Sequence, residues 1–276
     1  MVEHVTGLTL LVNHYLGPFA MALLSWLHVT PENPETPIPQ HVVMGVVVLI
    51  LGSLLALFLR SRLSVEKPGA TQQVAELLLT NPLGFGIQDL LEENVHHGAL
   101  QLVPFVGTVS VFVLLSNLLS VFPLFAAPTA NKTVPLGCAI LTFLYFNWQG
   151  IKHHGVGHYL LTFAGAPKKL GDWFLAILLF PVEIVSTSAR ILSLTVRLWA
   201  NILASDLLYT IFLSLFSLAT VAAWSKSSVF GMVIAVLPAT IPIAFIGLHI
   251  FVAIIQAYIF TVLPSVYLGM ATADEH

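Results

Sequence analysis

The stretch VVMGVVVLILGSLLALFL occupies residues 42–59 and contains no charged side chain. An α-helix rises 1.5 Å per residue, so about 20 apolar residues are enough to cross the hydrocarbon core of a bilayer. Arg60 and Arg62 follow directly and mark the end of the apolar run. We therefore predict a transmembrane helix over residues 42–59.

The composition of the whole chain agrees with a membrane location. Of its 276 residues 57% are hydrophobic and 8% are charged, and the mean hydropathy is +0.93, whereas soluble domains carry about 25% charged residues. The net charge of −3 provides no basic excess for binding nucleic acid. We therefore predict an integral membrane protein with no nucleic-acid partner.

Four further apolar regions predict the rest of the architecture, over residues 103–126, 134–149, 174–223 and 229–270. The last two exceed 40 residues, and as single helices each measures roughly 60–75 Å, against a hydrocarbon core of about 30 Å. Each is therefore either a tight pair of crossings or a bent, strongly tilted helix. We favour the second alternative, which predicts an all-α polytopic membrane protein with about five transmembrane helices. The last two helices then form a long, membrane-embedded hairpin.

Residues 1–39 are predicted to form a separate N-terminal segment, and residues 40–276 the membrane domain. Residues 8–29 are apolar but interrupted by four residues, which favours a surface-lying or re-entrant helix over a full span: Asn13, His14, Gly17 and Pro18. Residues 30–39, TPENPETPIP, are a proline-rich linker.

The placement of basic residues predicts the orientation. With five spans, one side of the membrane holds Arg60, Arg62, Lys67, Lys152, Lys168 and Lys169, and the other holds Lys132 and Lys226. By the positive-inside rule this places the N-terminus outside and the C-terminus in the cytoplasm. Paired crossings in the two long regions leave the termini on the same sides, so the count does not exclude them.

Charged residues lie inside the fourth apolar region, whose centre reads SLTVRLWANILASDLL over residues 193–208. An arginine at mid-bilayer costs about 2.5–3.5 kcal/mol on insertion scales. At 100° per residue, four polar side chains fall within about 80° of arc: Glu183, Arg190, Arg197 and Asn201. This polar seam is predicted to face protein or water. Asp206 lies about half a turn from Arg197, which indicates a different environment.

Structural roles remain as alternatives for these charges. Arg190 is equally compatible with an interfacial position, Glu183 with a contact at the start of its helix, and Arg197 with a structural ion pair. His249 and Gln256 are seven residues apart on one helix face. Two loop clusters contain histidines without a supporting carboxylate pattern, so we predict no metal site there: His96–His97 and His153–His154–His158.

These stretches resemble subunit a of the F-type ATP synthases. SLTVRLWANILASDLL is similar to the family pattern S-L-x-x-R-L-[FW]-[GA]-N-x-x-A-[GS]-[ED]. HIFVAIIQAYIFTVLPSVYLGMA, residues 249–271, resembles the family's C-terminal helix, and SNLLSVFP and PTANKTVPLG resemble the end of its second span and the following loop. The resemblance covers most of residues 40–276.

The resemblance implies a stator subunit of a rotary, proton-translocating ATP synthase in a bacterial inner membrane. The implied partners are a ring of c subunits that each carry a carboxylate, b-type peripheral stalk subunits, the lipid bilayer and, indirectly, the catalytic head. No nucleotide site and no cofactor is expected on this chain. Two aqueous half-channels are implied to reach the ring from opposite sides.

The implied residue roles follow the family motifs. The essential arginine corresponds to Arg197, the polar residue one turn later to Asn201, the outer half-channel pair to Asp206 and His249, the glutamine facing the arginine to Gln256, and the inner half-channel acid to Glu183. A secondary polar seam comprises Arg190, Ser193, Asn117, Ser120 and Asn131. Ser120 and Asn131 stand where the family often has acids, so the outer half-channel is expected to depend more on Asp206 and His249.

Two other functions remain as alternatives. In a secondary transporter Arg197 binds an anionic substrate, but the inverted repeats typical of that class are not visible in the sequence. In a membrane metalloprotease the loop histidines bind the metal, but the sequence contains no H-E-x-x-H motif.

Overall fold

The computed structural model describes the backbone of residues 5–31, 33–64, 68–81, 84–95, 98–122, 125–163, 165, 172–224 and 228–273. Within these ranges, the side chains of residues 160, 162, 163, 172, 173, 209, 213, 215–224 and 228–243 lie outside the description.

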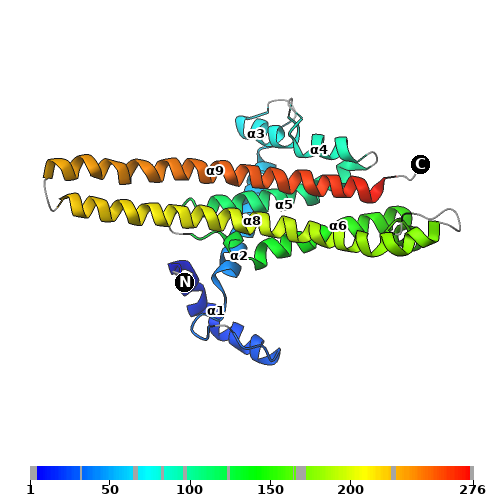
Figure 1. Cartoon of the computed structure of the whole chain (residues 1–276), viewed down its shortest axis with the longest axis horizontal. Helices are drawn as coiled ribbons and strands as arrows, with labels where there is room; N and C mark the ends of the chain where they lie inside the picture. The colour runs from blue at the N-terminus through cyan, green and yellow to red at the C-terminus, as the bar shows by residue number, and fades with distance from the viewer. Residues whose placement is uncertain are drawn as a thin grey trace. The chain divides into compact units, whose positions relative to one another are not determined.

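The described residues form α-helices joined by turns and one short 3₁₀ helix, with no strand among them. The helices are α1 (Gly7–Trp26), α2 (Gln40–Ser61), α3 (Ala70–Leu79), α4 (Ile87–Asn94), α5 (Ala99–Leu119), η1 (Pro128–Ala130), α6 (Thr133–His154), α7 (Val156–Phe163), α8 (Asp172–Trp224) and α9 (Ser228–Thr272). Figure 1 shows this order, with α8 and α9 as the longest helices. The prediction of an all-α protein is therefore confirmed.

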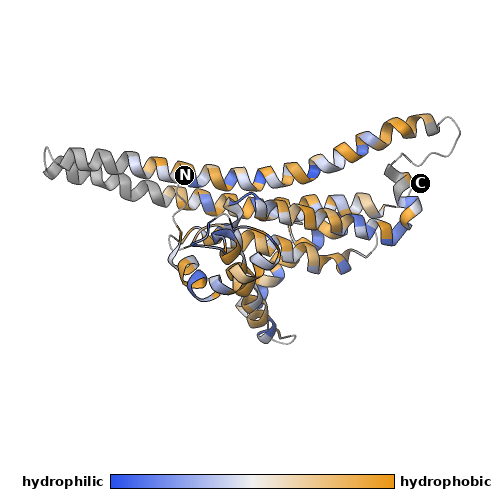
Figure 2. Ribbon diagram, turned by 90° about the horizontal axis from the view of Figure 1, so that it is seen from below, coloured by the Kyte–Doolittle hydropathy of each residue, from blue (hydrophilic) through white to orange (hydrophobic). Residues whose placement is uncertain are grey.

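Six of the described helices are long and apolar enough to cross a membrane: α1, α2, α5, α6 and most of α8 and α9. Figure 2 shows these helices coloured mainly as hydrophobic, with hydrophilic residues scattered along them. Five of the six correspond to the predicted spans, and α1 adds one candidate by length and composition.

The two long regions are single helices and not tight pairs of crossings. Helix α8 has 53 residues and α9 has 45, which at 1.5 Å per residue gives lengths of about 65–80 Å. Neither can stand upright in a hydrocarbon core of about 30 Å. Length alone thus requires that each helix lies at a large angle to the membrane normal or extends well beyond the core.

The chain packs into two compact units, and each long helix contributes to both. Unit 1 contains residues 1–50, 113–131 and 198–256, and unit 2 contains residues 51–112, 132–197 and 257–276. Each unit is described by itself below.

In unit 1 the second half of α8 packs antiparallel to the first half of α9. Ser205 of α8 hydrogen-bonds to His249 of α9 at 2.8 Å. Later in α8 and earlier in α9, the ring centroids of Phe212 and Phe245 lie 5.1 Å apart. The end of α5 joins this pair through a hydrogen bond between Ser120 and the same His249. Three helices therefore meet around one buried histidine.

Unit 2 contains an apolar core contributed by α4 to α7 and α9. Its buried members are Leu91, Val95, Ala99, Leu102, Val106, Phe146, Tyr159, Leu268 and Ala271. Phe105 and Tyr145 stack beside it with ring centroids 3.6 Å apart. This packing fixes α7 and the C-terminal end of α9 against α6.

Helix α7 begins immediately after α6 because a glycine separates them. Gly155 has φ +79° and donates its N–H to the carbonyl of Ile151 at 2.8 Å. Glycine adopts this conformation without steric cost, so it ends one helix and lets the chain turn into the next. The turn brings Tyr159 of α7 back against Gly150 of α6, where an added Cβ would overlap the tyrosine ring.

Helix α5 begins and ends earlier than the sequence predicts. The predicted span is 103–126, and the helix covers Ala99–Leu119. Pro123 in the sequence cannot donate a backbone hydrogen bond and disfavours helical backbone before it. The helix therefore ends before the apolar run does. The early end places Asn117 and Ser120 at the terminus of α5.

Candidate functional site

A cavity in unit 1, the His249 cavity, has a volume of about 200 Å³ and is lined by Ser120, Val121, Ser205, Asp206, Phe245, Ile246 and His249. Since liquid water occupies about 30 Å³ per molecule, a cavity of this size holds several waters. The imidazole of His249 is buried, whereas the Asp206 carboxyl is partly exposed. The cavity therefore places one acid and one imidazole on a common space that admits water.

Hydrogen bonds determine which nitrogen of His249 carries a proton. Nε2 lies 3.0 Å from the backbone carbonyl oxygen of Asn117 and 2.8 Å from Ser120 Oγ. A carbonyl oxygen only accepts hydrogen bonds, and Ser120 Oγ already donates its hydrogen to the same carbonyl at 3.0 Å. Both contacts therefore require Nε2 to be a donor.

The other ring nitrogen of His249 has its partner on α8. Nδ1 lies 2.8 Å from Ser205 Oγ, and a hydroxyl both donates and accepts. When the imidazole is neutral, Ser205 donates to Nδ1, and when it is charged, Nδ1 donates to Ser205. Because Ser205 precedes Asp206 in the chain, Nδ1 faces the part of α8 that also contributes the acid.

Asn117 is fully buried and supports the histidine from α5. Its Oδ1 accepts a hydrogen bond from Thr129 Oγ1 at 2.7 Å, which ties η1 to α5. Among the described residues three buried polar atoms have no hydrogen-bond partner: Ser116 Oγ, Asn117 Nδ2 and Gln256 Oε1. An unpaired buried polar atom costs about 1–3 kcal/mol, so unit 1 retains unused capacity to bind water.

Unit 2 contains a second polar cavity, the Glu183 cavity, with a volume of about 120 Å³ and a lining of Phe146, Tyr159, Glu183, Thr187, Arg190, Tyr267, Met270 and Ala271. Arg190 Nη2 lies 3.4 Å from Glu183 Oε1, and the guanidinium carbon lies 5.2 Å from the centroid of the Tyr267 ring. Thr187 Oγ1 donates to the Glu183 backbone carbonyl at 2.7 Å. The acid of this cavity is thus paired with a cation, in contrast to Asp206.

Tyr159 closes one side of the Glu183 cavity from α7, outside the candidate membrane spans. Its hydroxyl donates to Asn147 Oδ1 at 3.0 Å. Burial raises the pKa of the Tyr159 phenol above its ordinary value of 10.0, while the Arg190 charge lowers it and Glu183 raises it. The phenol is therefore neutral at physiological pH and acts as a fixed hydrogen-bond donor.

The remaining predicted residues of α8 lie on a surface stripe. Ser193, Arg197 and Asn201 are four residues apart, so they share one helix face. Ser193 and Asn201 are exposed and Arg197 is partly exposed, with its Nη2 3.4 Å from Ser193 Oγ. The neighbouring face is buried through Leu194 and Leu198. We call Ser193, Arg197 and Asn201 the arginine stripe.

Of the loop histidines at which no metal site is predicted, the structure describes His153, His154 and His158. No group of three or more His, Cys, Asp or Glu side chains suited to a metal is found in the part of the chain that the structure describes. The rings of His153, His154 and His158 lie near one another, with centroids 4.8 and 5.8 Å apart. His96 and His97 lie outside the described residues.

Sequence comparison identifies relatives along the entire chain. Residues 41–269 match the family described as ATP synthase A chain. Proteins named ATP synthase subunit a from Koribacter versatilis (strain Ellin345) and Solibacter usitatus (strain Ellin6076) are both 37% identical to the chain. The first aligns over 275 residues, 100% of both chains, and the second over 264 residues, 96% of this chain and 99% of the relative.

The chain belongs to the ATP synthase A chain family.

As a member of the ATP synthase A chain family, the chain is a multi-pass membrane subunit of an ATP synthase complex, with a part in ATP synthesis and proton transport. The resemblance of the SLTVRLWANILASDLL and HIFVAIIQAYIF stretches to this family is thereby confirmed.

The structure brings the predicted residues of this family member together in three groups. Asp206, His249 and Ser120 line the His249 cavity, and the backbone carbonyl of Asn117 contacts His249. Glu183 and Arg190 pair in the Glu183 cavity. Ser193, Arg197 and Asn201 form the arginine stripe, while Gln256 is buried on α9 and Asn131 follows η1.

Sequence reasoning missed Ser205, Tyr159 and Tyr267. Ser205 lies inside the quoted motif, but its contact with His249 is 44 residues away in sequence. Tyr159 and Tyr267 belong to runs whose apolar neighbours predict only packing. Their single usable signal is the hydroxyl of each side chain, because a buried tyrosine hydroxyl usually finds a polar partner.

Proposed function

We propose that the chain is the stator subunit that delivers protons to, and removes them from, a rotating ring of carboxylate-bearing subunits. The arginine stripe carries this proposal. A partly exposed arginine beside exposed serine and asparagine is costly against lipid, so this face of α8 favours a polar partner over acyl chains. A ring of membrane-embedded carboxylates supplies the complementary charge.

Arginine suits the role of a fixed charge. Its guanidinium remains protonated in proteins, so Arg197 cannot pass a proton on. A permanent cation favours the ionised form of an approaching carboxylate, which makes the ring group release its proton. The same cation opposes direct passage of protons past the stripe.

The two polar cavities supply the access routes. Along an ideal helix, Arg197 follows Glu183 by about 21 Å of rise and precedes Asp206 by about 14 Å. We assign the Asp206–His249 side to the outer half-channel and the Glu183 side to the inner half-channel. The unpaired atoms Asn117 Nδ2 and Gln256 Oε1 support water beyond the His249 cavity. The ring subunits, b-type stalk subunits and bacterial inner membrane are the partners and location that this function requires.

Energy for rotation comes from the membrane potential. Each elementary charge that crosses 100 mV releases about 2.3 kcal/mol, so several protons are needed for each ATP formed on a separate catalytic head. In this scheme the chain itself is non-catalytic.

The test is Arg197→Ala in the complete ATP synthase reconstituted in vesicles. ATP-driven proton pumping is expected to be lost while the complex remains assembled. Ser193→Ala, in the same stripe, serves as the matched control and is expected to retain most pumping. Normal pumping by Arg197→Ala contradicts the proposal.

A second experiment tests the partner. Cys138→Ser removes the single cysteine of the chain, and Asn201→Cys then provides one thiol in the arginine stripe. Oxidation is expected to form a disulfide with a cysteine placed beside the ring carboxylate. A matched thiol at Leu192, which is 61% exposed and lies about 180° around the helix from Asn201, is expected to react less.

A further inference from the structure

Helix α1 has the length of a membrane span, but the linker that follows it returns to the beginning of the helix. The backbone N–H of Thr6 donates to Gln40 Oε1 at 3.3 Å, so the start of α1 lies beside the start of α2. Asn13 Nδ2 donates to the carbonyl of Ile38 at 3.0 Å, and Asn13 Oδ1 accepts from the N–H of Ile38 at 2.9 Å. The linker before α2 therefore runs back along α1.

The far end of α1 is built to reverse the chain. His28 has φ +57°, its N–H donates to Ser25 at 3.2 Å, and the N–H of Val29 donates to Leu24 at 3.0 Å. This pair of bonds, with a left-handed residue just past the helix, is a Schellman motif. The chain thus turns at the end of α1 and returns along it.

This return path is incompatible with a transmembrane α1. If α1 crossed the bilayer from the side where α2 begins, the non-helical linker would have to cross it again in the opposite direction. Irregular backbone exposed to lipid does not occur in the hydrocarbon core, because its polar groups have no partners there. The linker also carries Glu35 and Asn33, both exposed. Both ends of α1 therefore belong to the same side of the membrane.

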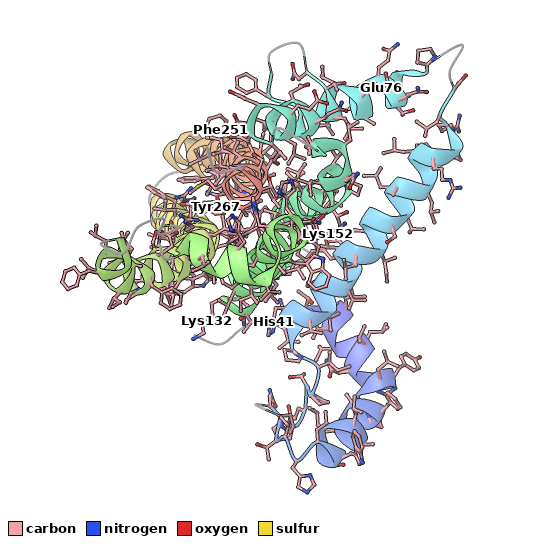
Figure 3. All side chains as sticks on the ribbon, turned by 90° about the vertical axis from the view of Figure 1, so that its right-hand side faces the viewer. His41, Glu76, Lys132, Lys152, Phe251 and Tyr267 are labelled. Atoms are coloured by element: carbon pink, nitrogen blue, oxygen red, sulfur yellow. The ribbon has the colours of Figure 1, made fainter. Side chains whose placement is uncertain are left out.

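The exposed surface of α1 is nevertheless apolar on one side. Five large side chains fall within about 100° of arc: Tyr15, Leu16, Phe19, Leu23 and Trp26. Each is at least 49% exposed, and Phe19 and Trp26 are 72% and 76% exposed. We call these five residues the apolar stripe, and Figure 3 shows side chains of α1, in the darkest blue, projecting into open space.

The other sides of α1 are mixed, because Leu10 and Leu11 are also exposed, at 53% and 56%. Thr9, Asn13 and Gly17 are buried beneath the linker, where Gly17 contacts Pro37. His14 and Ser25 lie roughly opposite the apolar stripe and are exposed. Tyrosine and tryptophan at exposed positions beside apolar side chains are typical of a membrane interface.

We propose that α1 and residues 27–39 form an interfacial hairpin that lies on the bilayer surface where α2 begins, with the apolar stripe inserted into lipid. Lipid is the occupant because the hairpin is continuous with α2, whose first turns expose Val42, Val46 and Ile50 to the same bilayer. The hairpin anchors the entry of α2 and leaves five crossings for the chain. The inference does not depend on the proton-transfer roles proposed above.

Single-cysteine labelling in the complete complex tests the hairpin. On a Cys138→Ser background, thiols are placed at Phe19 in the apolar stripe, at His14 as the matched control on the polar face, at Asn33 in the linker, and at Arg62 beyond the other end of α2. A membrane-impermeant maleimide is added to vesicles of each orientation. His14→Cys and Asn33→Cys are expected to react from one side, Arg62→Cys from the other, and Phe19→Cys only after detergent is added.

Two labelling results overturn the proposal. Reaction of Asn33→Cys from the side that labels Arg62→Cys means that α1 crosses the membrane. Reaction of Phe19→Cys at the rate of His14→Cys in intact vesicles means that the apolar stripe lies in water.

A spin label at Phe19→Cys separates lipid from a protein partner. Collisions with dissolved oxygen and a mobile spectrum are expected in lipid, and an immobilised, oxygen-protected label overturns the assignment of lipid as the occupant. Leu23→Cys, also in the apolar stripe, provides the same readout if the Phe19 variant fails to assemble.

Discussion

The His249 cavity and the Glu183 cavity hold their ionisable groups by different means. In the His249 cavity an imidazole is held by two hydroxyls and a backbone carbonyl. In the Glu183 cavity a carboxylate is held by a guanidinium that also stacks on a tyrosine ring. The two cavities thus differ in what contacts the ionisable group, which is neutral in the first and a cation in the second. From this difference we expect substitutions in the His249 cavity to change proton pumping more than substitutions in the Glu183 cavity.

Of the changes that compare the two cavities, removal of the acid in the His249 cavity is expected to slow proton pumping most. Asp206→Asn removes the only carboxyl in the cavity lining and is expected to slow ATP-driven proton pumping by about 10²-fold, since proton-transfer groups contribute about 10²–10⁴-fold. The pH profile of pumping is expected to change as well. Thr210→Ala, one turn further on the exposed side of α8, is the control and should pump normally. An unchanged rate and profile in Asp206→Asn would remove Asp206 from the proton path.

The second effect concerns Ser205, which contacts His249 Nδ1, the nitrogen that we propose exchanges protons. Ser205→Ala deletes the hydroxyl partner of His249 Nδ1, and the loss of one hydrogen bond of about 1 kcal/mol corresponds to pumping about fivefold slower. Ser120→Ala is expected to change the rate less than about twofold, because the Asn117 carbonyl still accepts from Nε2. The measurement is the initial rate of pumping in vesicles. A larger effect from Ser120→Ala than from Ser205→Ala would show that Nε2, not Nδ1, exchanges protons.

A third experiment examines the ion pair of the Glu183 cavity. Arg190→Ala, Glu183→Gln and the double variant form a cycle whose coupling is expected to be about 0.5–1 kcal/mol. The estimate is modest because both side chains are partly exposed, at 22% and 40%. Thermal unfolding of the purified complex measures it, and Ser188→Ala, exposed on the same helix, controls for general effects. Strictly additive changes would mean that the two groups do not interact.

The smallest effect is expected from Tyr159. Because burial raises the pKa of its phenol, the folded state holds that proton more tightly than the unfolded chain. The associated stability is fully present below about pH 10 and is lost as the pH rises through the folded-state pKa. The wild-type complex should therefore lose thermal stability more steeply than Tyr159→Phe above about pH 10. Parallel losses in both proteins would rule out titration of Tyr159 in that range.

Sequence alone predicts the helices well because long apolar runs have few alternatives in lipid. The two longest predicted regions, 174–223 and 229–270, differ from α8 and α9 by at most two residues at each end. Short helices are harder to predict, since α7 has eight residues and lies in a region interpreted as a loop. Hydropathy cannot identify such a segment, because a single short apolar run is compatible with loop, helix or strand.

The candidate site divides in the same way. Charges in an apolar helix identify themselves by their cost, so Glu183, Arg190, Arg197 and Asp206 are visible in the sequence. Their partners are not, because contacts such as Ser205 with His249 depend on how α8 and α9 pack. Serines and tyrosines are ordinary in such helices, and only their neighbours in space give them a role.

The contact between His249 and the Asn117 carbonyl has an evolutionary consequence. A side-chain partner disappears with one codon change, but every residue at position 117 retains a peptide oxygen. The orientation of the imidazole therefore depends on the position of the main chain at the end of α5 and not on the side chain at position 117. The side chain at position 120, a serine in this chain, can change without turning the ring.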